Sequence, residues 1–209
     1  MVAKKTKKAV APVSTLAVPA PTFRLLKPFH HLAAEEGTFG FARFYWTEGD
    51  GHRQSILPNF RKKRRPVDQG EEDTAARVEV LLPSDAPEEY SDADFLVKRF
   101  EEKLPVEETT AYAQVTLRFP DARNVHHPYE TARAWVRSFY VDDPKKAAPV
   151  VLVLHTPHLA GSDAPLHVHA LILPRQLRWY GWAKKIEIAG DDAKAQAQES
   201  WKEFRKNRL

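Results

Sequence analysis

The chain contains no cysteine among its 209 residues. Disulfide bonds, thiolate zinc sites and a cysteine nucleophile are therefore excluded, and any metal must be held by histidine, aspartate, glutamate or backbone oxygen. Long apolar runs are also missing, since none approaches the roughly 20 residues that a membrane-spanning helix needs. No apolar secretory segment follows the first methionine. These absences predict a soluble, cytoplasmic protein with no membrane partner.

Charge is moderate in amount and basic in balance. Charged residues make up 29% of the chain, hydrophobic residues 43%, and the formal net charge is +4. A chain of this length and apolar content suits one domain with tails. The isoelectric point of about 9.2 favours a polyanionic partner only weakly. The distribution of the basic residues therefore carries more information than their number.

Composition divides the chain into three parts. Residues 1–22 contain Ala, Val, Pro and Lys without an acid, which predicts a disordered basic tail with either no role or a weak contact to phosphates. A single domain is expected over 23–190, with a charged loop near 60–75 where a basic run meets an acidic one. The stretch 191–209 opens with two aspartates suited to helix N-capping and ends in basic residues, so a C-terminal helix is expected.

Regular patterning begins near residue 77. Period-two alternation and continuous apolar runs predict strands, and these lie at 77–82, 112–119, 150–154 and 166–173. Helical spacing of apolar residues predicts helices at 93–103 and 129–141. This order of strands and helices indicates an α+β fold. We expect an antiparallel sheet of about five strands with the helices packed on one face, and with 112–119 as a half-buried strand.

Two histidines interrupt the apolar strand predicted at 166–173. His167 and His169 are two residues apart, so their imidazoles leave the same face of the sheet, while Val168 and Ala170 enter the core. His155 closes the preceding strand, and pairing of the two strands as a hairpin would place it near His167. Three imidazoles that converge in this way form a cage for a divalent transition metal, with coordination positions open to a substrate oxygen.

The alternative is that these histidines are polar residues on an exposed sheet face. Packing gives no reason for two histidines in a strand that is otherwise wholly apolar, so the metal site is the favoured interpretation. His158 lies in the loop between the two strands. His126 and His127 precede Pro128 at the start of a predicted helix, where turn or cap residues are common. No role is assigned to these three histidines.

The residues around the histidines resemble the HUH motif of relaxases. His155 and the segment SDAPLHVHALILPR at 162–175 are similar to the MobA/MobL type of plasmid mobilisation relaxase, which nicks plasmid DNA at a transfer origin. Arg118-Phe119-Pro120 and Ala134-Trp135-Val136 before the motif, and Gly181-Trp182 after it, extend the similarity, which covers mainly 75–186. The resemblance implies an HUH endonuclease fold with a ferredoxin-like palm.

The resemblance also implies a reaction. In this family a divalent ion, Mg²⁺ or Mn²⁺, held by the three histidines polarises the scissile phosphate, and a tyrosine forms a phosphotyrosine link to the DNA 5′ end. The family tyrosine ends a small-residue helix that is not visible here, and Tyr45 is the candidate in the corresponding region. Tyr140 and Tyr180 are alternatives, and Tyr45 as a core aromatic is another. Glu79 matches an acidic position that would support the metal, or it is a solvent-facing carboxylate.

Basic residues supply candidate contacts to DNA phosphates. One group is a run of five that adjoins an aromatic cluster, for which a solvated loop is the alternative interpretation. A second group follows the histidines along the chain. The full set comprises Arg61, Lys62, Lys63, Arg64, Arg65, Arg175, Arg178, Lys184 and Lys185.

The sequence thus predicts an enzyme, a metal-dependent, site- and strand-specific DNA nickase of plasmid mobilisation type. Its partners would be single-stranded DNA or a transfer-origin hairpin, and accessory mobilisation proteins. One alternative is a catalytically inactive, relaxase-derived DNA-binding protein. A remote alternative is a histidine-triad nucleotide phosphohydrolase, because residues 167–175 superficially resemble the signature of that class. That chemistry needs a nucleophilic histidine where this chain has Leu171.

Overall fold

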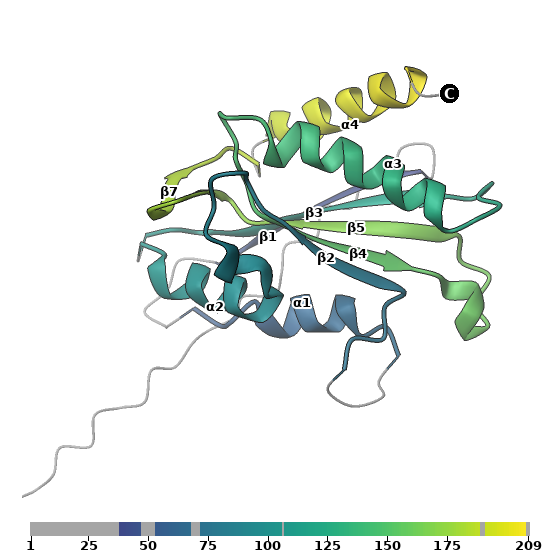
Figure 1. The fold of residues 1–209 in the computed structure, drawn as a ribbon, viewed down its shortest axis with the longest axis horizontal. Helices are drawn as coiled ribbons and strands as arrows, with labels where there is room; N and C mark the ends of the chain where they lie inside the picture. The colour runs from purple at the N-terminus through teal and green to yellow at the C-terminus, as the bar shows by residue number, and fades with distance from the viewer. Residues whose placement is uncertain (1–37, 47–52, 68–71, 106, 189–190, 208–209) are drawn as a thin grey trace, which may run out of the picture.

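A five-stranded antiparallel sheet forms the centre of the molecule (Figure 1). The computed structural model describes residues 38–46, 53–67, 72–105, 107–188 and 191–207, so the tail predicted at 1–22 lies outside the described residues. The strand order is β1-β3-β5-β4-β2. The strands are β1 (Phe39–Tyr45), β2 (Arg77–Leu81), β3 (Thr110–Phe119), β4 (Val150–His155) and β5 (Leu166–Ile172). The expected α+β fold with about five strands is confirmed, and β5 is its central strand.

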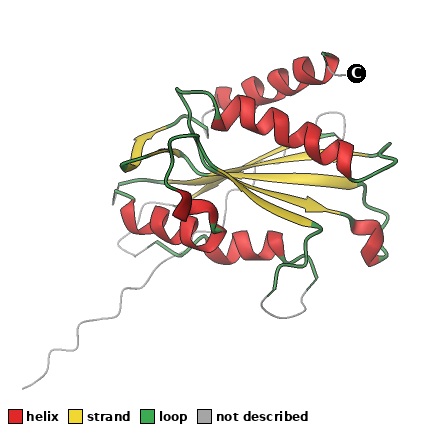
Figure 2. Ribbon diagram, in the orientation of Figure 1, coloured by secondary structure: helices red, strands yellow, loops and turns green. Residues whose placement is uncertain are grey.

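Helices cover both faces of the sheet, as Figure 2 shows in red on either side of the yellow strands. Helices α3 (His126–Val136) and α4 (Asp191–Lys206) lie on one face, and α1 (Leu57–Arg64) and α2 (Ala93–Lys103) lie on the other. Each face has its own buried apolar cluster. The expectation of helices on one face only was wrong. The apolar run of β4 is the reason, since Leu152 and Leu154 pack under α3 while Val151 and Val153 pack under α1 and α2.

Strand β3 shows the same effect. Its alternation was expected to leave one side open to solvent, yet every residue from Thr110 to Leu117 is buried. Ala113 and Val115 face the α3 and α4 layer, and Tyr112 faces the α1 and α2 layer. Polar residues on the second face of β3 therefore lie under helices and need partners there.

Helix α1 occupies part of the stretch expected as a charged loop near 60–75. A proline stands in its first turn, where its fixed φ suits a helix start. The Glu101 carboxylate of α2 accepts hydrogen bonds from Ser55 Oγ, at 2.9 Å, and from the Ile56 N–H. Four basic residues in the last turn complement the helix dipole. The loop prediction was therefore wrong over 60–64. Local sequence did not show the helix, because the carboxylate that accepts from its first N–H groups belongs to another helix.

The other helices agree closely with their predicted positions. Helix α2 begins after Asp92, whose side chain accepts a hydrogen bond from the Phe95 N–H at 2.7 Å. Helix α3 continues into a π-turn, Arg137–Val141, and 3₁₀ turns lie at Glu88–Ser91 and Pro157–Ala160. The C-terminal helix α4 is present. No helix among the described residues has the length and apolarity to cross a membrane.

A two-stranded ribbon of β6 (Arg175–Arg178) and β7 (Gly181–Lys185) follows β5. It lies at the opposite end of the sheet from the turn that follows His155 (Figure 1). Trp182 anchors the ribbon, because its ring packs edge-on against Phe100 and Tyr90 with centroid distances of 5.2 and 5.8 Å. Gly181 has φ of 103°, which glycine adopts without strain.

Candidate metal centre

Three histidines converge on the sheet face that α1 covers. His155, at the end of β4, is the register partner of His167 on β5, and His169 is opposite Val153. One ligand nitrogen from each histidine lies within 4.8 Å of the other two. Nδ1 of His155 is 3.1 Å from Nε2 of His167. Two nitrogens bound to one ion at about 2.1 Å and roughly a right angle lie about 3.0 Å apart, so this spacing fits a shared metal.

Each imidazole is oriented by a hydrogen bond on the side away from the cluster. His155 Nε2 lies 2.6 Å from the Lys63 carbonyl oxygen, and His167 Nδ1 lies 2.8 Å from the Pro165 carbonyl oxygen. When these nitrogens donate, the opposite nitrogen of each ring keeps its lone pair for a ligand. His169 Nδ1 is 2.9 Å from Thr116 Oγ1. The arrangement therefore presents Nδ1 of His155 and Nε2 of the other two histidines.

The histidines are held in the uncharged form that metal binding requires. Burial lowers the pKa of His155 and His167 below the ordinary value and outweighs the hydrogen bonds to the Lys63 and Pro165 carbonyl oxygens, which raise it. Burial also lowers the pKa of His169 well below its usual range, with Lys63 the next cause. Arg118 lowers the pKa of His167 and His169 in the same sense. Two cationic side chains thus face the cluster.

The donor set fits a transition metal. The cluster holds three imidazoles and no carboxylate among the described residues. Imidazole nitrogen suits Zn²⁺, Fe²⁺ and similar ions, whereas Mg²⁺ prefers oxygen ligands. Three protein ligands leave further positions open to solvent or substrate. The residues present therefore fit a divalent metal.

A pocket of about 440 Å³ opens beside His169 under α1. Its basic lining residues are Lys62, Lys63 and Arg118, and no acidic side chain lines it among the described residues. Gln114, Thr116 and Arg118 were not among the site residues predicted from the sequence, although Arg118 belongs to the segment that resembles the relaxases. Their polar side chains on alternate positions of β3 could have indicated the site. That face of β3 was predicted to face solvent, but the layer of α1 and α2 covers it.

The basic run at 61–65 divides into two groups. Arg61, Arg64 and Arg65 form ion pairs, the first with Asp94, Arg64 with both Asp94 and Asp73, and Arg65 with Asp73. The two lysines between them line the pocket instead. The structure therefore brings Lys62 and Lys63, but not the three arginine guanidinium groups, to the histidine site.

The structure does not bring the second basic group to the histidines. Arg175 donates to the Ala183 carbonyl oxygen at 2.7 Å within the ribbon. Arg178 contacts Asp85 and the Pro144 carbonyl oxygen, and Lys185 pairs with the buried Glu108 at 2.9 Å. Lys184 is exposed on β7. The ribbon that carries all four lies at the far end of the sheet.

All six tyrosines of the chain belong to the described residues. Tyr45 is paired with Thr110 at one end of β3, six residues from the Thr116 that contacts His169, which is about 20 Å along a strand. Tyr140 packs in the α3 layer, and Tyr180 is exposed at the ribbon turn. Only Tyr112 lines the pocket, and its side chain is buried. The structure therefore brings none of the three sequence candidates to the histidines.

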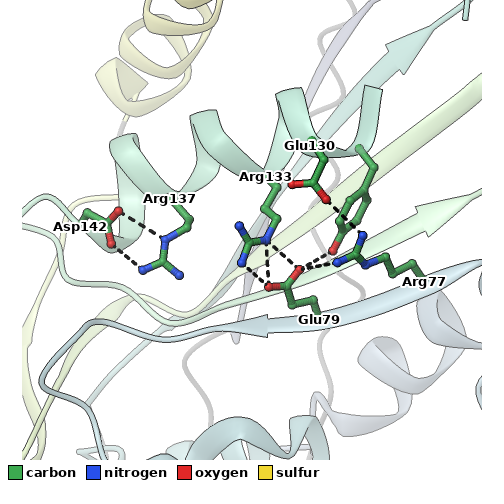
Figure 3. Close-up of polar contacts among 7 residues, drawn as sticks. Arg77, Glu79, Glu130, Arg133, Arg137 and Asp142 are labelled. Carbon is green, nitrogen blue, oxygen red and sulfur yellow. Dashed lines mark hydrogen bonds and ion pairs between the residues drawn. The ribbon is translucent and has the colours of Figure 1, made fainter. Parts of the chain in front are cut away.

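Glu79 lies on the opposite sheet face from the histidines. Figure 3 shows its carboxylate held by the side chain of Arg133 on α3 and contacted by Arg77. The Tyr129 hydroxyl also donates to it at 2.7 Å. Burial opposes its charge, but these partners outweigh burial and the pKa of Glu79 lies below its ordinary value. Glu79 stabilises the packing of α3 on β2 and does not reach the metal centre.

Comparison with known proteins supports the fold. No protein-family model matches the chain, and neither does any curated protein sequence. A solved relaxase structure from work on the molecular basis of vancomycin resistance transfer in Staphylococcus aureus is similar, with a TM-score of 0.54. The match covers 66% of this chain and 71% of that chain, at 16% sequence identity. The chain therefore has a relaxase-like fold.

Proposed function

We propose that this protein binds DNA at the histidine centre and uses a divalent metal there to hold a phosphodiester of the strand. The observation that carries the proposal is the convergence of His155, His167 and His169 on a relaxase-like scaffold, beside a pocket that the described residues line with three cationic side chains and no acidic one. When bound, the metal would act as a Lewis acid toward a phosphate oxygen. His155, His167 and His169 would hold it.

The metal proposed is a divalent transition ion. Mg²⁺ and Mn²⁺ are the ions expected from the resemblance to mobilisation relaxases. Three imidazole ligands favour Mn²⁺ over Mg²⁺, because nitrogen ligands bind Mg²⁺ poorly. The cytoplasm, where plasmid DNA is processed, is the proposed location.

The first candidate activity is nicking of plasmid DNA through a phosphotyrosine intermediate. It needs a tyrosine hydroxyl at the scissile phosphate, and the sequence candidate is Tyr45. The strand register sets Tyr45 about 20 Å from the level of Thr116. Nicking through Tyr45 therefore requires a DNA strand or a chain rearrangement that spans this distance.

The second candidate is DNA binding without cleavage. The position of the six tyrosines favours it, because only Tyr112 lines the pocket beside His169 and burial raises the pKa of its hydroxyl. A buried phenol that resists ionisation is a poor nucleophile. The histidine-triad alternative gains no support, since Leu171 is packed in the apolar cluster under α1 and α2.

One experiment separates the candidates. Supercoiled plasmid and a labelled single-stranded oligonucleotide are incubated with the protein in Mn²⁺, in Mg²⁺ and in chelator, and both nicking and retardation are measured. His167→Ala and each tyrosine-to-phenylalanine variant are compared with wild type. Retardation that needs His167, without nicking, supports binding alone, whereas nicking with protein attached to the 5′ end identifies a nickase. Absence of any metal- or His167-dependent DNA interaction overturns the proposal.

A further inference from the structure

Arg118 is a half-buried cation beside the metal centre, and no described residue forms an ion pair with it. It is the register partner of His167 on the adjacent strand β3. Its Nη1 atom is buried and has no hydrogen-bond partner, and no acidic side chain pairs with Arg118 among the described residues. A buried guanidinium normally has a carboxylate or another acceptor, because burial of an unpaired charge is costly. The position therefore fits an anion that no described side chain supplies.

Gly40 of β1 makes room for this guanidinium. A Cβ atom at Gly40 would lie 3.2 Å from Nη1 of Arg118 and 3.4 Å from Cβ of Thr116. The Arg118 side chain thus extends across the neighbouring strand on the same face as Thr116, which contacts His169. A residue with a Cβ atom at position 40 would require the guanidinium to shift by a few tenths of an ångström.

A second cation faces the same space. Lys63, at the end of α1, lines the pocket together with Arg118 and His169. Burial, with the neighbouring Lys62, lowers the pKa of the Lys63 ammonium group. No ion pair of Lys63 occurs among the described residues. Two unpaired cations and an imidazole around one pocket attract an anion strongly, because the enclosed site screens them less than open solvent would.

We infer that this pocket is a phosphodiester-binding site in which Arg118 and Lys63 hold a phosphate of the strand next to the metal centre, with Gly40 keeping the arginine in place. The inference deepens the proposed function and rests on it for the identity of the anion as nucleic acid. A guanidinium donates two parallel hydrogen bonds to phosphate oxygens, whereas an ammonium acts as a point charge. Arg118 would orient the phosphate and Lys63 would add affinity.

The test is carried out on the full chain in chelator, so that the metal plays no part. Binding of a short oligothymidylate is measured by fluorescence anisotropy over a range of salt, and binding of inorganic phosphate by calorimetry. Arg118→Gln and Gly40→Ala are compared with wild type. Arg137→Gln is the matched control, since that arginine is paired with Asp142 and belongs to the α3 side of the sheet.

We expect Arg118→Gln and Gly40→Ala to weaken both phosphate and oligothymidylate binding, about tenfold for Arg118→Gln. The slope of the logarithm of the binding constant against the logarithm of the salt concentration should fall in magnitude by about 0.7 for the lost contact. Arg137→Gln should match wild type. The melting temperature of each variant is measured to confirm that it folds. Removal of an unpaired buried cation should leave the melting temperature of the anion-free protein unchanged or higher.

The outcomes separate the inference from the proposed function. If wild type binds oligothymidylate and Arg118→Gln binds it equally well, the phosphate site at Arg118 is refuted while DNA binding stands. If inorganic phosphate binds in an Arg118-dependent way but no oligonucleotide binds under any condition, the anion pocket stands and the proposed function fails. A fall in melting temperature for Arg118→Gln without phosphate would also count against the inference, because it would show a structural role.

Discussion

His155 and His167 face each other across the β4–β5 ladder, with Nδ1 of the first 3.1 Å from Nε2 of the second. This contact joins residues 12 positions apart in the chain. It is made possible by a turn that returns the chain in register. Carbonyl oxygens of Lys63 and Pro165 lie against the outer nitrogens of the two rings. These two contacts fix the orientation of both rings, which reduces the ordering that metal binding must impose.

Removal of one histidine should abolish metal binding. His167→Ala leaves two imidazoles and a gap on β5, so Mn²⁺ should no longer raise the melting temperature. In wild type, Mn²⁺ at about 100 times its dissociation constant should stabilise the fold by about 2.7 kcal/mol. His158→Ala is the control, since His158 is exposed in the turn after β4. Equal stabilisation of wild type and His167→Ala in thermal denaturation would rule out the site.

The hydrogen bond between Thr116 and His169 should tune metal affinity. Thr116→Val keeps the shape of the side chain but removes the oxygen 2.9 Å from His169 Nδ1. Loss of such an orienting contact lowers metal affinity by about 10- to 100-fold. Thr131→Val removes a similar contact, of 3.1 Å, to His127 outside the cluster, and should leave affinity unchanged. Competition calorimetry with Mn²⁺ measures both, and an unchanged affinity in Thr116→Val would contradict the assigned orientation of His169.

The two basic groups should differ in their effect on DNA. Lys63→Gln should weaken oligonucleotide binding. The slope of log K against log salt concentration should fall in magnitude by about 0.7, as expected for one lost phosphate contact on a single strand. Arg178→Gln should have little effect, because Arg178 is paired with Asp85 on the ribbon at the far end of the sheet. Anisotropy titrations at several salt concentrations distinguish them. The reverse pattern would place the DNA on the ribbon instead.

The Glu79 cluster should contribute stability that depends on pH. Glu79→Gln should destabilise the protein by about 2 kcal/mol at pH 7, since Arg133 and Tyr129 lose a charged partner. The pKa of Glu79 is below its ordinary value in the folded state. Its contribution is therefore present above about pH 4.5 and is lost as the pH falls through the folded pKa. Urea unfolding at pH 7 and near pH 3 measures the difference.

A matched control for that experiment is Glu130→Gln. Glu130 forms an exposed ion pair with Arg77 at 3.2 Å, and its side chain is 38% exposed, so its loss should change stability by less than about 0.5 kcal/mol. If the difference in free energy of unfolding between wild type and Glu79→Gln is the same at both pH values, packing and not charge is responsible. DNA binding should be unchanged in both variants, because this cluster lies on the opposite sheet face from the histidines.

The local pattern of the sequence was sufficient for most of the sheet. Alternation and apolar runs placed four strands, β2 to β5, and the spacing of His155, His167 and His169 was enough to predict their convergence. Strand β1 and helix α1 were not predicted. Aromatic residues crowded among glycines hid the alternation of β1. At the start of α1, the Ser55 hydroxyl and the Ile56 N–H donate to Glu101 of a different helix. Information of that kind is not present in a local window of sequence.

Local alternation, which depends only on backbone geometry, determined by itself that His167 and His169 leave the same face of their strand. The place of His155 depended in addition on the pairing of β4 with β5. The tertiary structure alone decided what surrounds them. The packing of α1 over that face separated Lys62 and Lys63 from the ion-paired arginines of the same run and left Arg118 with no ion pair among the described residues. Strand register set Tyr45 far from the histidines. These relations join residues far apart in the chain, and only the packing of helices on both faces of the sheet fixes them.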